Sequence, residues 1–135
     1  HSMGGHGALV AALRNPDRYR SVSAFAPIVA PTQCPWGDKA FINYLGDTRE
    51  LWRTYDCCEL IRERADQLPM LVDQGESDQF LQEQLKTGLL EQACEETGYQ
   101  ATIRRQPGYD HSYFFIASFI GSHIEFHGHE LGKAS

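Results

Sequence analysis

The chain begins HSMGGHG, His1 to Gly7, and continues into an apolar, alanine-rich segment from Ala8 to Leu13. Small residues surround Ser2, so the backbone can turn sharply there without a clash. A turn of this kind, between a strand and a helix, is how a G-x-S-x-G motif exposes its serine as a nucleophile. Gly4 is the second glycine of that motif, and the first would precede the chain. The alternative is that Ser2 is the N-cap of a helix beginning near Gly4, since serine is favoured at that position.

The composition indicates a globular protein that acts on a small molecule. Its 135 residues, 41% hydrophobic and 22% charged, suffice for one domain with a sizeable core. Twelve basic and eighteen acidic residues give a net charge of -6. Nucleic acids and anionic membranes require clustered Lys and Arg, so neither is an expected partner. The sequence also contains no run of about 18 apolar residues that could span a membrane.

The four cysteines are predicted to be free thiols, buried or half-buried, because free cysteine behaves as a small hydrophobe. They show no C-x-x-C spacing, and an adjacent pair makes a strained disulfide. We therefore expect a reducing, cytoplasmic location. The cysteines are Cys34, Cys57, Cys58 and Cys94.

Helical and strand patterns alternate along the chain. The expected helices cover Gly5 to Arg14, a segment around Ala40 to Leu45, one or two surface helices within Thr48 to Ala65 with Asp56 as a cap, Gln79 to about Thr97, and Ser112 to about His127. The expected strands are Ser21 to Ile28, Pro69 to Gly75, and Gln100 to Gln106. This order predicts an α/β fold of three mostly parallel strands with crossover helices.

Three strands make a small sheet, and the first, Ser21 to Ile28, would leave an apolar edge open. In a parallel fold a preceding strand is expected to pair there. We therefore expect residues 1–135 to be the carboxyl-terminal part of a single domain whose sheet an amino-terminal half completes.

Acyl transfer needs a nucleophile, a base, a group that orients the base, and donors for the oxyanion. Ser2 is the candidate nucleophile, and the backbone N–H of Met3 is a candidate oxyanion donor at a helix amino end, where the dipole favours negative charge. His111 is the candidate base, because it follows a strand and a Pro-Gly break and so lies at a strand's carboxyl end. His1 and His6 flank the serine too closely to reach its hydroxyl.

Three aspartates are candidates for the acid. Asp78 is favoured, because it lies past Gly75 in a loop after a strand. Asp73 ends that strand, where it would brace the turn, and Asp110 adjoins His111 and points poorly for orienting its ring. Helix capping is the alternative role for each of them.

Other residue clusters are assigned to less specific roles. Trp36 lies in an irregular, proline-rich stretch after a strand, where substrate walls are usually built, and is a candidate substrate-binding residue.

Two of the histidines near the carboxyl end are four residues apart and share a helix face. No carboxylate or thiol pattern completes a metal set with them, so we expect neither metal nor cofactor. These histidines are His123, His127 and His129. The nearby aromatic residues are expected in the core: Tyr113, Phe114, Phe115 and Phe119.

Several stretches together closely resemble the S-formylglutathione hydrolase family, also called esterase D, and the likeness spans nearly the whole chain. They are His1 to Leu9, Cys34 to Gly37 with Lys39 to Phe41, Tyr44 to Gly46, Asp73 to Gly75 with Asp78 and Phe80-Leu81, and Gly108 to Tyr113. The resemblance implies the carboxyl-terminal half of an α/β-hydrolase fold. It also implies a cytosolic, metal-independent serine thioesterase, commonly a homodimer, that hydrolyses S-formylglutathione to glutathione and formate in formaldehyde detoxification and also cleaves small carboxylic esters.

Carried over by position, the family's triad becomes Ser2, Asp78 and His111, in agreement with the choice made from the residues. The second oxyanion donor and much of the pocket are expected in the amino-terminal half, so this chain alone should be poorly active. The alternative function is a non-catalytic α/β module for binding or scaffolding. In that case Ser2 caps a helix, and the open sheet edge recruits a partner chain.

Overall fold

A parallel sheet of three strands lies at the centre of the computed structural model, which describes residues 1–63 and 67–133. The strands are β1 (Val22–Phe25), β2 (Met70–Gly75) and β3 (Ala101–Gln106), and they pair in that order. β2 is buried at all six positions, as a central parallel strand should be. The expected α/β fold with three parallel strands is thus confirmed.

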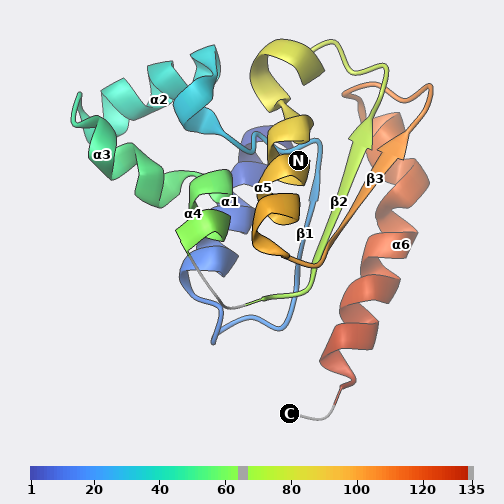
Figure 1. The fold of residues 1–135 in the computed structure, drawn as a ribbon. Coiled ribbons are helices and arrows are strands. Elements are labelled where there is room, and N and C mark those ends of the chain that lie inside the picture. The colour runs from blue at the N-terminus through green and yellow to red at the C-terminus, as the bar shows by residue number, and fades with distance from the viewer. Residues whose placement is uncertain (64–66, 134–135) are drawn as a thin grey trace.

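Helices cover both faces of the sheet (Figure 1). α1, α4 and α5 lie on one face, and α6 lies along the other. α2 and α3 lie apart from the sheet, at the upper left of Figure 1. The bounds are α1 (Ser2–Arg14), α2 (Pro35–Leu45), α3 (Arg49–Trp52), α4 (Cys57–Glu63), α5 (Thr87–Thr97) and α6 (Tyr113–Leu131). Among the described residues, no helix is long and apolar enough to cross a membrane.

Two apolar clusters form the core. The larger one includes residues of α1, α4, α5 and the sheet, with Leu9, Ile61, Val72 and Leu90 fully buried. α1 contributes through apolar residues three and four positions apart, and it ends at Arg14 because Asn15-Pro16 cannot continue a helix. The smaller cluster includes Phe25, Ala26, Ile28, Cys34, Leu85 and Phe115. It joins the carboxyl end of β1 to α6.

The expected single helix from Gln79 to Thr97 is wrong. A π-helical turn covers Leu81–Leu85, and Lys86 then adopts φ 51°, a left-handed conformation, before α5 begins at Thr87. The Lys86 ammonium donates to the Gln33 carbonyl at 2.6 Å, which ties this break to the α2 region. The apolar spacing continues through the break, so it gave no sign of the change in conformation.

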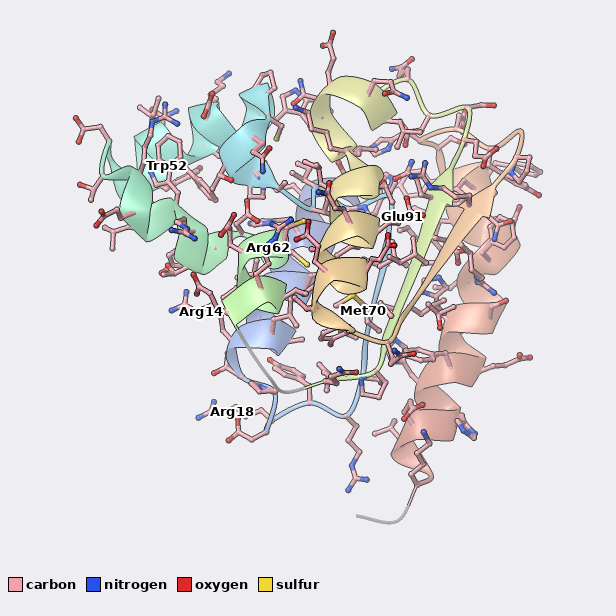
Figure 2. The ribbon with its side chains drawn as sticks, in the orientation of Figure 1. Arg14, Arg18, Trp52, Arg62, Met70 and Glu91 are labelled. Carbon is pink, nitrogen blue, oxygen red and sulfur yellow. The ribbon has the colours of Figure 1, made fainter. Side chains whose placement is uncertain are left out.

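The surface helices expected between Thr48 and Ala65 are partly wrong, because much of this segment is buried; Ala65 itself lies outside the described residues. Trp52, labelled in Figure 2, is almost fully buried, packs edge-on against Phe41 at 5.3 Å between ring centroids, and donates its indole N–H to the Gly46 carbonyl at 3.0 Å. α4 buries both of its cysteines. The charged residues of α4 face outward, and in the sequence they made the segment resemble a surface helix.

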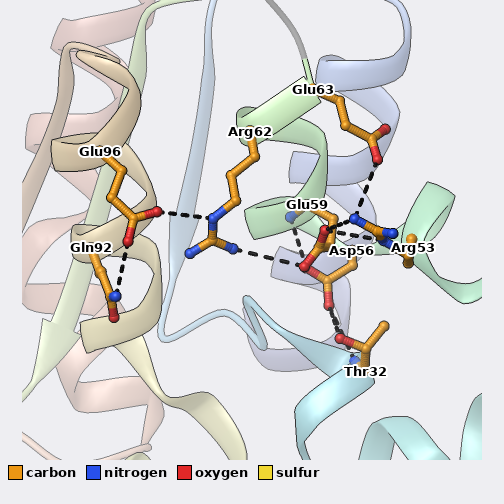
Figure 3. Close-up of polar contacts among 8 residues, drawn as sticks. All are labelled: Thr32, Arg53, Asp56, Glu59, Arg62, Glu63, Gln92 and Glu96. Carbon is orange, nitrogen blue, oxygen red and sulfur yellow. Dashed lines mark hydrogen bonds and ion pairs between the residues drawn. The ribbon is translucent and has the colours of Figure 1, made fainter.

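Asp56 caps α4, as expected, and also joins it to the segment before α2 (Figure 3). One carboxylate oxygen accepts the backbone N–H of Glu59 at 3.1 Å, and the other accepts the hydroxyl of Thr32 at 2.8 Å. Arg62 extends from α4 to Glu96 on α5 at 3.1 Å. The exposed ion pairs contribute little stability, whereas the buried cap is expected to contribute about 1 kcal/mol.

The cysteine expectation is confirmed: all four are free and buried. Burial raises the pKa of the Cys58 thiol, and burial together with the charge of Glu91 raises the pKa of Cys94 to about 11. These thiols are therefore protonated at neutral pH and poor nucleophiles.

The aromatic residues at the start of α6 divide between the core and the surface. Phe115 is fully buried, and Phe119 packs against the smaller cluster. Tyr113 and Phe114 are 85% and 73% exposed, so their assignment to the core is wrong. α6 carries apolar residues all round, and its buried residues, Phe115 and His123, lie on the side that faces β1 and β2.

Candidate active site

Ser2 occupies a strained turn at the start of α1. Its φ is 54°, a left-handed conformation that non-glycine residues rarely adopt and that costs on the order of 1–3 kcal/mol. The Ser2 carbonyl accepts the backbone N–H of Ile28 at 3.3 Å, just beyond β1. Gly5 permits this approach, since a Cβ there would lie 2.9 Å from the Pro27 Cβ. Backbone strain at the serine, with the chain held by tight packing, is the local geometry of a nucleophile turn.

The alternative in which Ser2 is the N-cap of α1 does not match the structure. α1 already begins at Ser2, its N-cap is His1, and no side chain caps this end. The backbone N–H of Met3 lies in the first turn, where helical N–H groups have no carbonyl one turn back. The helix dipole favours negative charge at this end of α1.

Asp78 and His111 form a hydrogen-bonded pair at the carboxyl edge of the sheet. His111 Nδ1 lies 2.7 Å from Asp78 Oδ2, with the carboxylate buried and the imidazole half-buried. The other carboxylate oxygen of Asp78 accepts the backbone N–H of Phe80 at 2.8 Å. Because Asp78 uses Nδ1, the Nε2 of His111 is left to exchange a proton with another group.

Two loops, one after β2 and one after β3, are joined to hold this pair. The backbone N–H of Ser77 donates to the Tyr109 carbonyl at 2.9 Å. Gly75 lies so close to the second loop that a Cβ there would be 2.3 Å from the same Tyr109 carbonyl oxygen. The Asp78–His111 distance is thus set by backbone contacts between the loops.

The other two candidate aspartates have different partners. Asp73 is fully buried and binds His123 at 2.7 Å and the Arg104 Nε at 2.8 Å, so it links β2 and β3 to α6. Asp110 is exposed and accepts the backbone N–H of Ser112 at 3.0 Å. Of the three, Asp78 is the one that contacts His111.

Asp73 is expected to stabilise the fold in a pH-dependent way. Burial opposes its ionisation, but hydrogen bonds from His123, Arg104 and Gln106 outweigh burial and lower its pKa from 3.8 to about 2. A carboxyl whose pKa is lower in the folded state stabilises that state above about pH 4, and the effect is lost as pH falls through about 2. The shift corresponds to about 2 kcal/mol.

Unfolding by urea between pH 2 and pH 7 measures this contribution. We expect Asp73→Asn to lower the free energy of unfolding at pH 7 and to flatten its decline between pH 4 and pH 2. Asp17→Asn, at an exposed position, serves as the control. An unchanged acid decline in Asp73→Asn would refute the assignment.

The ring of His1 contacts that of His111, with 4.4 Å between centroids. Since His1 adjoins Ser2, this contact places the serine turn beside the candidate base. His6, one helical turn further along α1, faces a cavity instead. Burial lowers the pKa of His6, so it is neutral at pH 7.

That cavity, of about 300 Å³, opens beside the Ser2 turn and is almost entirely apolar. Trp36 lies in its wall and contacts Phe80 at 4.8 Å between ring centroids, and Phe80 contacts the ring of His111 at 5.2 Å. This aromatic chain connects the cavity to the candidate base. The lining residues are Met3, His6, Ile28, Pro31, Trp36, Gly37, Ala40, Phe41, Tyr44, Leu45 and Tyr55.

Two of the α6 histidines, His123 and His127, bind separate partners. His123 binds Asp73, while the two ring nitrogens of His127 lie 2.7 Å and 2.8 Å from the hydroxyls of Ser21 and Ser23. Their shared helix face therefore serves to attach α6 to β1 and β2.

Gln74, beside the candidate acid, was not predicted as a site residue from the sequence. Its signal in the sequence was a polar side chain in a strand that begins with the apolar residues Met70, Leu71 and Val72.

Taken together, a parallel sheet with a serine turn and an Asp–His pair at its carboxyl edge defines the class of the α/β-hydrolases. Residues 1–126 match the model of the family described as "Putative esterase", and the chain belongs to this esterase family.

Solved structures agree with this assignment. The chain is similar to an S-formylglutathione hydrolase from Agrobacterium tumefaciens, with 47% identity and a TM-score of 0.93 over 98% of this chain and 48% of that chain. It shares its fold with an S-formylglutathione hydrolase from Staphylococcus aureus, with 19% identity and a TM-score of 0.73 over 93% of this chain and 51% of that one. A ferulic acid esterase has 20% identity and a TM-score of 0.71 over 96% of this chain and 49% of that one. The chain thus spans about half the length of these proteins.

Proposed function

We propose that this chain carries the catalytic triad Ser2, Asp78 and His111 of a serine thioesterase that hydrolyses S-formylglutathione to glutathione and formate. The hydrogen bond of 2.7 Å between Asp78 and His111, beside the strained Ser2 turn, is the observation that carries the proposal. The 47% identity to an S-formylglutathione hydrolase supports the substrate. In the cytoplasm this reaction would serve formaldehyde detoxification.

The mechanism follows from the atoms at the site. Ser2 Oγ attacks the thioester carbonyl carbon while His111 Nε2 takes its proton, and Asp78 stabilises the imidazolium and fixes its orientation. The Met3 N–H binds the oxyanion. The C–S bond then breaks, and the glutathione sulfur leaves with the proton from His111. Water, deprotonated by His111, attacks the formyl-serine, which releases formate and restores the Ser2 hydroxyl.

Trp36 is proposed to contact the substrate, because it lies in the wall of the apolar cavity that reaches His111 through Phe80. Small carboxylic esters would place apolar groups against this wall. Trp36→Ala is expected to lower kcat/KM for such esters by about tenfold, chiefly through KM, since the lost apolar contact is worth about 1.5 kcal/mol or more.

Steady-state kinetics on a series of p-nitrophenyl esters tests this role. Tyr19→Ala is a suitable control, since Tyr19 is a part-exposed aromatic residue outside this cavity. Equal losses for short and long acyl chains, with KM unchanged, would contradict a binding role for Trp36.

The triad itself is tested by covalent labelling. In the full-length protein a fluorophosphonate should label Ser2, and the label should be absent from Ser2→Ala and from wild type denatured beforehand. Hydrolysis of S-formylglutathione, followed by the release of the free thiol, tests the substrate. Labelling without thioester hydrolysis would retain the triad and reject the substrate, and the absence of both would reject the proposal.

A further inference from the structure

We infer that Gln74 is a positioning residue for the Asp78 carboxylate and that Thr87 fixes the orientation of Gln74. This inference rests on the triad proposed above and extends it to two residues outside it. Gln74 belongs to β2 and Thr87 is the first residue of α5, so two different elements support the acid.

Gln74 is fully buried, and both ends of its amide are hydrogen-bonded. The nitrogen donates to Asp78 Oδ2 at 3.1 Å and to the Gly75 carbonyl at 3.0 Å. The oxygen accepts the hydroxyl of Thr87 at 2.9 Å. A carboxylate and a carbonyl only accept hydrogen bonds, so these partners settle which end of the amide faces Asp78.

The Asp78 carboxylate therefore has a donor on every side. Oδ1 accepts the N–H of Phe80, and Oδ2 accepts His111 and Gln74 together. Hydrogen bonds to both oxygens prevent the carboxylate from rotating. With Gln74 in place, Oδ2 is held toward Nδ1 of His111, which selects the tautomer with a proton on Nδ1.

Gln74 places a polar side chain in the interior of the fold. β2 buries apolar side chains at Met70, Leu71 and Val72, and a buried amide is unfavourable unless every polar atom has a partner. Thr87 supplies the partner of the amide oxygen, because the left-handed Lys86 ends the π-helical turn just before it. Both Thr87 and Gln74 are fully buried. The break between the π-helical turn and α5 thus places a hydroxyl against the amide that holds the acid.

Two substitutions at Gln74 test the inference in the full-length protein. Gln74→Met keeps the size of the side chain but removes the donor, and we expect kcat to fall by about 10- to 100-fold with KM within twofold, since an orientation effect acts on the transition state. Gln74→Glu places a second carboxyl beside Asp78, and like charges this close resist ionising together. The acid limb of the pH profile of kcat/KM should then move to higher pH by about one unit. A purely structural role of Gln74 would lower the thermal midpoint of Gln74→Met without this loss of kcat at nearly constant KM.

Thr87 gives an independent test, should Gln74→Met fail to fold. Thr87→Val leaves the amide oxygen unpartnered and should lower kcat severalfold, and Thr87→Ser, which keeps the hydroxyl, should restore it. Gln92→Met is the matched control, because Gln92 is on α5 and contacts Glu96 far from Asp78. Thermal midpoints report folding for each variant.

The rate constant of fluorophosphonate labelling at Ser2 is the second readout, and it needs no thioester. If wild type is labelled and the Gln74 and Thr87 variants react at the wild-type rate with an unshifted pH profile, the positioning role is overturned while the triad stands. If wild type is not labelled, the triad fails and the positioning role fails with it. Slower labelling in Gln74→Met and Thr87→Val, with recovery in Thr87→Ser, supports the role.

Discussion

Ser2→Ala in the full-length protein is expected to lower kcat for S-formylglutathione by on the order of 10⁴-fold or more, and His111→Ala by a similar factor. Each change removes the path by which the serine proton reaches Nε2 of the imidazole. Substrate binding should persist, so KM should change little. Neither variant should lose its fold, because both side chains lie at the edge of the sheet, outside the two apolar clusters.

The matched pair Asp78→Asn and Asp73→Asn separates the two buried acids. Asp78→Asn should lower kcat by a factor comparable to Ser2→Ala, because the amide can donate its N–H to Nδ1 and so favour the tautomer with the proton on Nε2, which cannot act as the base. Asp73→Asn should instead lower stability, since its carboxylate binds His123 and Arg104. Values of kcat measured at a temperature where both variants are folded show which aspartate is the acid of the triad. If Asp73→Asn proved the more damaging to kcat, Asp78 would not be the acid.

The strands and most helices could be predicted because their signals are local. An apolar run bounded by Pro69 and Gly75 indicates a buried parallel strand, and Asn15-Pro16 marks the end of α1. The break at Lys86 could not be predicted. Its left-handed backbone is stabilised by a bond to Gln33, 53 residues away in the chain, and no local pattern records such a contact.

The candidate site shows the same division. The sequence made Ser2 a candidate through its neighbouring glycines and His111 a candidate through its position after a strand, and both features are local. The choice between Asp73 and Asp78 was harder because Asp73 lies in β2 and Asp78 in the loop that follows it, only five residues further along the chain. The two side chains differ in direction: Asp73 faces α6, and Asp78 faces the loop after β3. Gln74 was missed because its role depends on Thr87, which the expected continuous helix from Gln79 had placed in the middle of a helix.

Gly75→Ala is expected to impair both stability and catalysis, because the loop that carries His111 lies against this glycine. A Cβ at position 75 would lie 2.3 Å from the Tyr109 carbonyl oxygen and 3.0 Å from that of Asp110. Both contacts are backbone atoms, so no side-chain rotation relieves them, and the loop must move. Forcing extra volume into a packed site costs about 1–3 kcal/mol. A displacement of about 1 Å at a catalytic group costs about 10²-fold in rate.

Gly121→Ala provides the matched control. Gly121 is on α6 and a Cβ there meets nothing within 4 Å, so the change should leave kcat unaltered and raise stability by about 0.5–1 kcal/mol, as alanine favours helix. Urea unfolding and kcat/KM for both variants make the comparison. Because the Ser77 N–H also binds the displaced Tyr109 carbonyl, Gly75→Ala should slow fluorophosphonate labelling even where the protein remains folded. A folded Gly75→Ala variant with wild-type labelling would mean that contact between the two loops does not set the Asp78–His111 geometry.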